Sequence, residues 1–119
     1  YVNCYDDGVV TLNGSTLSQK AKVTESGETL LPVRAVAEAL GMQVHWDDEK
    51  GAVVSYSEEL APEGWTSQAL LSARPGGTVY GYEADGTAYE VGGTCVIENG
   101  VTYLSQATLL HLLDLYPAV

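Results

Sequence analysis

The spacing of apolar residues changes three times between residues 28 and 56, and no gap separates the changes. Residues 29–31 have the composition of a short strand. The apolar residues that follow recur at i, i+3, i+4 and i+7, the spacing of one helix face. They are Val33, Val36, Ala37 and Leu40. Alternation then predicts a strand over 43–46, a turn over 47–51 and a returning strand over 53–56. We therefore expect a short helix that packs on an antiparallel hairpin.

Both ends of this helix carry residues suited to those places. Pro32 is predicted in the first turn, where its missing N–H has no intrahelical partner. Gly41 is predicted to end the helix in a left-handed conformation. Arg34 lies in the first turn, where the helix dipole disfavours a cation. We expect compensation from backbone carbonyls, an acidic side chain, or an anionic ligand.

Length and charge limit the classes of function. A chain of 119 residues predicts a single domain over 1–119. Sixteen acidic and five basic residues give a formal charge of −11, which repels nucleic acid and anionic membrane surfaces. No run approaches the ~20 apolar residues of a membrane span. We expect a soluble chain, and its start at Tyr1 suggests a mature chain or a piece of a longer one.

Turn residues divide the rest of the chain. Asn13-Gly14 between apolar residues predicts a tight hairpin, since both central positions of that turn favour positive φ. A second hairpin is predicted over 78–91 around Asp85-Gly86. Residues 58–77 are predicted to be a connector, in which Trp65 to Arg74 form either a helical turn or an irregular strand.

The end of the chain resembles an earlier part of it. Residues 96–113 align with residues 23–40 and share the turn glycine, the strand threonine and leucine, and the last leucine. In the second copy Ser105 replaces the proline and is predicted to cap a helix with its hydroxyl group. The predicted fold is α+β, with antiparallel hairpins packed on two short helices in related units over 9–57 and 78–116.

These residues carry a resemblance to a known family. The sequence Glu28-Thr-Leu-Leu-Pro-Val-Arg-Ala-Val-Ala-Glu-Ala-Leu-Gly41, with Val44-His-Trp-Asp47 after it and Val10-Thr-Leu-Asn-Gly14 before it, closely resembles the copper amine oxidase N-terminal-like domain. The resemblance is strong over 9–57 and weak over 78–116. It implies a module of secreted and cell-envelope proteins of Gram-positive bacteria, and hence an extracellular or cell-surface location.

The resemblance implies no reaction. In the amine oxidases this module is a stalk that carries neither the copper nor the quinone cofactor. The cofactor motif has Asn directly before Tyr, whereas here Cys4 precedes Tyr5-Asp6. No serine lies in a Gly-x-Ser-x-Gly motif, and paired carboxylates occur only as neighbours on turns. We therefore expect a non-catalytic module without a cofactor.

The residues that could bind a transition metal are few. They are His45, His111, Cys4 and Cys95, and such sites use three or four converging ligands. We predict no metal site. Cys4 and Cys95 could form one disulfide in an oxidising compartment or remain two thiols, and the sequence leaves both open.

Five residues are candidates for contact with a ligand or partner: Arg34, Trp46, Trp65, Tyr80 and Tyr82. An arginine can bind a carboxylate, and the aromatic rings could form a platform for a sugar or a protein. We expect a non-catalytic module that associates with protein or with the cell wall inside a larger secreted protein. The alternative is a domain that binds wall glycan and targets an attached enzyme.

Overall fold

The computed structural model describes residues 2–5, 7–57, 63–64 and 69–113. One sheet has the strand order β1-β2-β3, from Val2–Cys4, Val10–Leu12 and Ser15–Thr16. A second has the order β11-β12-β5-β4, from Cys95–Glu98, Val101–Ser105, Thr29–Pro32 and Lys22–Val23. The third has the order β10-β9-β8-β7-β6, from Ala88–Val91, Val79–Tyr82, Leu71–Ala73, Gly51–Ser55 and Gln43–Asp47. Two helices, α1 (Val33–Ala39) and α2 (Gln106–Leu112), complete a fold that confirms the predicted α+β class.

The helix predicted after residue 31 forms as α1, with one correction at its start. Pro32 is the last residue of β5 and the N-cap of α1, with an extended ψ of 113°, so the helix begins one residue later than predicted. Gly41 ends α1 with φ 78°. Its N–H donates to the Glu38 carbonyl, and the N–H of Met42 donates to the Ala37 carbonyl. This pair of bonds is a Schellman motif, which satisfies the last carbonyl groups of the helix.

Three predicted hairpins are present. Leu12 pairs with Ser15 across Asn13 and Gly14, whose φ values are 50° and 87°. In the pairing of β6 with β7, Gln43 lies opposite Ser55 and Asp47 lies opposite Gly51. β9 pairs with β10 across the turn at Asp85 and Gly86. The turn residues agree with the prediction in each case. The returning strand predicted over 53–56 begins earlier, at Gly51, and all five residues of β7 are buried, so burial does not alternate along it.

The predicted connector over 58–77 is wrong for its described C-terminal part. Leu71–Ala73 forms β8, which pairs with β7 on one side and β9 on the other. All three residues of β8 are buried, so burial does not alternate between the two faces of the sheet, although Leu71, Ser72 and Ala73 alternate in polarity. Of the helical turn or irregular strand predicted for Trp65 to Arg74, residues 69–74 are described, and there the strand alternative is present as β8, whereas Trp65 lies outside the described residues.

The two aligned segments occupy matching places in the second sheet. β4, β5 and α1 follow one another in the first, and β11, β12 and α2 in the second. β5 and β12 are neighbours, with Leu31 opposite Leu104. Ser105 stands at the N-cap of α2, but its side chain makes no capping hydrogen bond, so the predicted cap is wrong. The residue still belongs to β12 and is 4% exposed, inside the fold rather than over the helix end.

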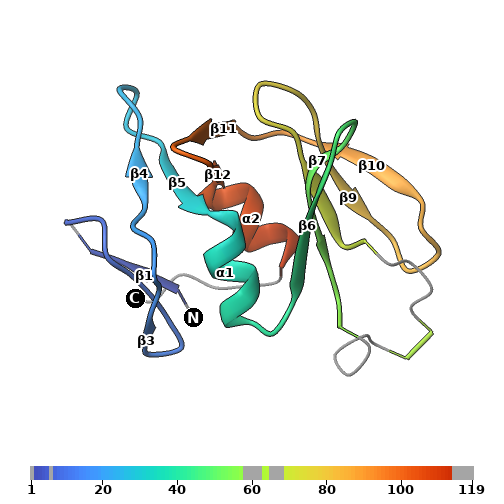
Figure 1. Cartoon of the computed structure of the whole chain (residues 1–119), viewed down its shortest axis with the longest axis horizontal. Coiled ribbons are helices and arrows are strands. Elements are labelled where there is room, and N and C mark those ends of the chain that lie inside the picture. The colour runs from blue at the N-terminus through green and yellow to red at the C-terminus, as the bar shows by residue number, and fades with distance from the viewer. Residues whose placement is uncertain (1, 6, 58–62, 65–68, 114–119) are drawn as a thin grey trace.

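Figure 1 shows α1 and α2 in the middle of the molecule, with β5 on one side and β6 on the other. Buried residues from all three sheets and both helices form one cluster, in which Val36, Leu31, Leu71 and Leu109 are fully enclosed. Leu40 only packs against this cluster, because it lies at the C-cap of α1 rather than inside the helix. Among the described residues, neither helix has the length and apolar character to span a bilayer.

Candidate functional site

A groove of about 400 Å³ opens between α1, β6 and the β11–β12 hairpin. The first turns of α1 form one wall with Val33, Arg34, Ala35 and Glu38. Opposite parts of the wall come from Val44, His45 and Trp46 of β6, and from Ile97 and Gly100–Thr102 of the hairpin. Two of the five predicted contact residues, Arg34 and Trp46, therefore line one groove.

Arg34 extends from α1 toward β6. Its Nη1 donates to the Val44 carbonyl over 3.4 Å, beyond the usual range of about 2.7–3.2 Å. This contact is the backbone-carbonyl compensation that the sequence analysis offered as one explanation. Within the described part of the chain, Arg34 has no carboxylate within ion-pair distance, although Glu38 lies one turn later on the same helix. The guanidinium group thus keeps free donors that face the groove.

Trp46 lies in β6 as predicted, two residues after Val44 and therefore on the same face of the strand, but its side chain is 53% exposed. The register places it in a row with Ala52, Ala73 and Val79, all of which are buried. β6 is the outer strand of its sheet, so the ring lies at the edge of this row. Ile97, across the groove, is 52% exposed. Two large apolar side chains therefore remain accessible in the same groove.

Tyr80 and Tyr82 lie elsewhere. Tyr80 is next to Val79 in β9, so its side chain points to the face of the sheet opposite Trp46. The Tyr82 hydroxyl lies 3.1 Å from the Ser72 hydroxyl, and the Lys50 ammonium group lies 5.8 Å from the Tyr82 ring centre. The tyrosines and Trp46 do not form one continuous platform. Trp65 lies outside the described residues.

Sequence reasoning missed the part of the groove contributed by the β11–β12 hairpin. Ile97, Val101 and Thr102 reach the groove because β12 pairs with β5 directly before α1. The one local indication was Asn99-Gly100, a turn dipeptide whose φ values are 52° and 77°. That dipeptide identifies the hairpin but not the position to which it folds.

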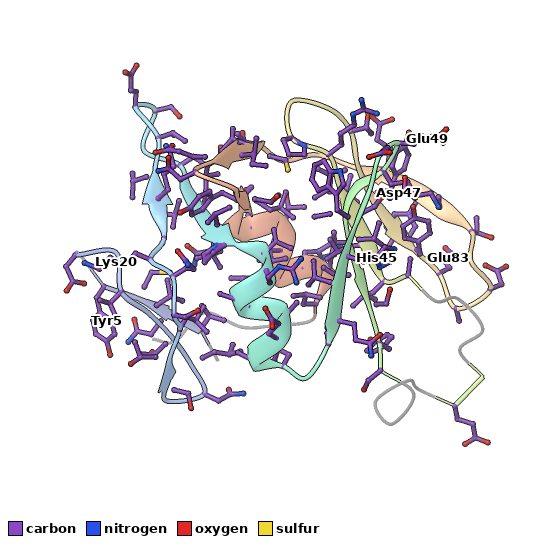
Figure 2. All side chains as sticks on the ribbon, viewed as in Figure 1. Tyr5, Lys20, His45, Asp47, Glu49 and Glu83 are labelled. Atoms are coloured by element: carbon purple, nitrogen blue, oxygen red, sulfur yellow. The ribbon has the colours of Figure 1, made fainter. Side chains whose placement is uncertain are left out.

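The candidate metal ligands are dispersed. His45 is on β6 and His111 is on α2, and the described residues contain no group of three His, Cys, Asp or Glu side chains able to hold an ion. Asp47 and Glu49 lie near the end of the β6–β7 hairpin, with His45 farther along β6 (Figure 2). The donors in the described part of the chain do not fit a copper centre, and the absence of metal binding stays a prediction.

The Asp47 carboxylate accepts backbone hydrogen bonds within the β6–β7 turn. Its Oδ1 accepts the N–H groups of Lys50 and Glu49 at 2.9 and 2.8 Å. These bonds stabilise the carboxylate and lower the pKa of Asp47 below its ordinary value. The residue therefore has a structural role in the turn that positions β6 beside the groove.

The two cysteines are free thiols in this structure. Cys4 is partly buried, and its Sγ donates to Gln106 Oε1 over 3.7 Å. Cys95 is 5% exposed, and burial raises the pKa of its thiol to about 11. Burial also raises the pKa of the Cys4 thiol. Neither thiol has the low pKa of a nucleophile at neutral pH.

Alkaline pH should destabilise the fold through Cys95. Because its folded pKa is raised from 9.0 to about 11, this contribution to stability is complete below pH 9 and is lost as the pH approaches 11. Two pKa units at about 1.4 kcal/mol each set an upper limit of about 3 kcal/mol, and screening by solvent reduces the expected loss over that interval to about 1–2 kcal/mol. Urea midpoints of the wild type and Cys95→Ala across this range measure the effect. All other side chains are the same in the two proteins, so parallel pH profiles would contradict the assignment to Cys95.

Comparison with known proteins adds one finding. The family model described as the copper amine oxidase N-terminal domain matches residues 11–114. Neither a curated protein nor a solved structure gave a significant match. The matched region includes both helices and all the residues that line the groove. The chain therefore belongs to the family of the copper amine oxidase N-terminal domain, a non-catalytic module of larger proteins.

Proposed function

We propose that this chain is an extracellular association module of a Gram-positive cell-envelope protein, and that its groove binds a protein partner. The observation that supports this function is the combination of Trp46, Ile97 and Arg34 around one groove. Exposed aromatic side chains and arginines contribute strongly to protein interfaces, since each combines a large contact area with polar donors.

The chemistry of the described residues agrees with association rather than catalysis. The groove contains Arg34, Glu38 and His45 as its ionisable side chains, without a nucleophile held by a base or a set of metal ligands. The formal charge of −11 disfavours nucleic acid and anionic membrane surfaces as partners. A polypeptide segment with few acidic residues does not meet this repulsion.

Wall glycan is the second candidate, because a half-exposed tryptophan in a groove can also stack on a sugar ring. The two candidate partners, a protein and a glycan, can be distinguished by the enzyme that removes each of them from the envelope. A protein partner is removed by protease, whereas a glycan survives protease and is removed by a muramidase.

Binding to isolated Gram-positive envelopes tests the proposal. We expect the purified chain to sediment with untreated envelopes and to lose this association after protease treatment of the envelopes. Trp46→Ala should weaken the association, because it removes a large part of the apolar wall. Tyr80→Ala is the matched control, since that exposed aromatic residue lies on the other sheet face. Association that resists protease but not muramidase would favour glycan, and equal effects of the two variants would contradict the groove as the site.

A further inference from the structure

The outer edge of β6 has backbone groups without a strand partner. The N–H of Leu70 donates to the Val54 carbonyl, so the polar groups of Val54 point toward β8. Val44 lies opposite Val54 in the antiparallel pair of β6 and β7. Because the polar groups of Val54 point away from β6, the two residues form a non-hydrogen-bonded pair, in which the N–H and C=O of each residue point away from the other strand. The polar groups of Val44 therefore point outward, and by the same alternation so do those of Trp46.

Arg34 provides the one hydrogen bond that reaches this edge from the described part of the chain. Its contact with the Val44 carbonyl is long at 3.4 Å, and the Trp46 N–H and C=O have no such partner among the described residues. Backbone groups with this spacing are what a further strand pairs with. The edge can therefore accept a strand once Arg34 releases Val44.

The opposite side of the groove is also shaped for an extended segment. β5 pairs with β12 only as far as Pro32 opposite Tyr103, because the chain then turns into α1. Val101 and Thr102 continue β12 beyond that point and line the groove. The groove thus lies between the outer strand β6 and an end of β12 that pairs with β11 but not with β5, with Ile97 as an accessible apolar contact.

Resting on the proposed protein-binding function, we propose that an extended peptide segment of a partner protein adds as a strand to the outer edge of β6. Alternate side chains of that segment contact Trp46 and Ile97, and one carboxylate of the segment pairs with Arg34. Strand addition of this kind takes its affinity from backbone hydrogen bonds and its specificity from the alternate side chains.

The charge of this chain favours some partners over others at the outer edge of β6. A second copy of this chain would bring two formal charges of −11 together, which opposes self-association through β6. Arg34 has no carboxylate partner among the described residues. Its planar guanidinium group can bind a carboxylate through two parallel hydrogen bonds, and this geometry favours a carboxylate in the partner segment. Glu38 beside it limits the segment to few acidic residues.

Amide hydrogen exchange on the full chain tests the pairing directly. In the free protein the Val44 and Trp46 amides should exchange quickly and the His45 amide slowly, because His45 bonds to β7. The probe is a peptide enriched on the wild-type chain from a displayed library of random dodecapeptides. On binding this peptide, the Val44 and Trp46 amides should become at least tenfold slower, while the His45 amide changes little. Unchanged exchange at Val44 and Trp46 would overturn strand addition.

Two variants test the backbone hydrogen bonds and the side-chain contacts of the bound peptide separately. Val44→Pro removes an outward N–H at an outer strand, where proline is tolerated, and should reduce peptide affinity at least tenfold relative to Val44→Ala. Arg34→Gln should reduce affinity about tenfold for a peptide with one glutamate and little for the matched glutamine peptide. If Val44→Pro does not fold, methylation of alternate peptide nitrogens makes the same test on the ligand.

The outcomes also distinguish this inference from the proposed function. Failure to enrich any peptide, together with protease-sensitive binding to envelopes, overturns strand addition and leaves the association function intact. Loss of both overturns both. An enriched peptide whose affinity is insensitive to Val44→Pro and to nitrogen methylation binds in another manner and overturns the inference alone.

Discussion

Gly51→Ala is expected to lower the free energy of unfolding by about 2–5 kcal/mol. Gly51 has φ +83°, and an L-residue in this region costs about 1–2 kcal/mol. A Cβ atom at this position would also lie 2.5 Å from the Ala73 carbonyl oxygen and 2.6 Å from the Arg74 Cα. Both atoms belong to the backbone at the end of β8, so overpacking adds about 1–3 kcal/mol. Urea denaturation with the slope m compared between variants measures the change.

Gly86→Ala is the matched control for this effect. Gly86 has φ +91° in the β9–β10 turn, but a Cβ atom there would meet nothing within 4 Å. The variant therefore has only the cost of the left-handed conformation, about 1–2 kcal/mol. If Gly86→Ala and Gly51→Ala lower the midpoint equally, the close approach of the β6–β7 hairpin to β8 is not present in solution.

The difference between these two glycines illustrates what the sequence could predict. Turns at Asn13-Gly14, Gly41 and Asp85-Gly86 were predicted because the conformational freedom of glycine is a local property. The contact of Gly51 with the end of β8 is not local. Residues 71–73 are buried on both faces of a sheet, and three residues are too few for their alternation to be recognised as a strand pattern.

The groove shows the same limit. Arg34 was identified as a candidate from its charge in the first turn of a helix and Trp46 from its aromatic ring, and both lie within one predicted helix-and-hairpin unit. Ile97 and Val101 join them through the pairing of β12 with β5, about seventy residues away in sequence. Aromatic composition also suggested Tyr80, but the strand register places it on the opposite sheet face. Pairing between distant strands therefore decided which candidates share a site.

Leu31→Ala is expected to lower the free energy of unfolding by about 2–5 kcal/mol, the usual range for a buried leucine. Leu31 is fully buried in β5, where it lies opposite Leu104 of β12. These two positions correspond in the alignment of residues 23–40 with 96–113, and their strands join the two hairpin–helix segments. The cavity left by the lost side chain would lie at this junction, enclosed by residues of both segments. Thermal or urea unfolding measures the change.

Leu40→Ala removes the same atoms at a site with less burial. From periodicity alone Leu40 belongs to the apolar face of the helix and should cost as much as Leu31. In the structure it is the C-cap residue of α1 and is only partly buried, so solvent and neighbouring side chains fill part of the space that its side chain leaves. We therefore expect a smaller loss than for Leu31→Ala, because less apolar surface returns to water. Equal losses for the two variants would mean that α1 continues through Leu40 and packs that residue inside the core.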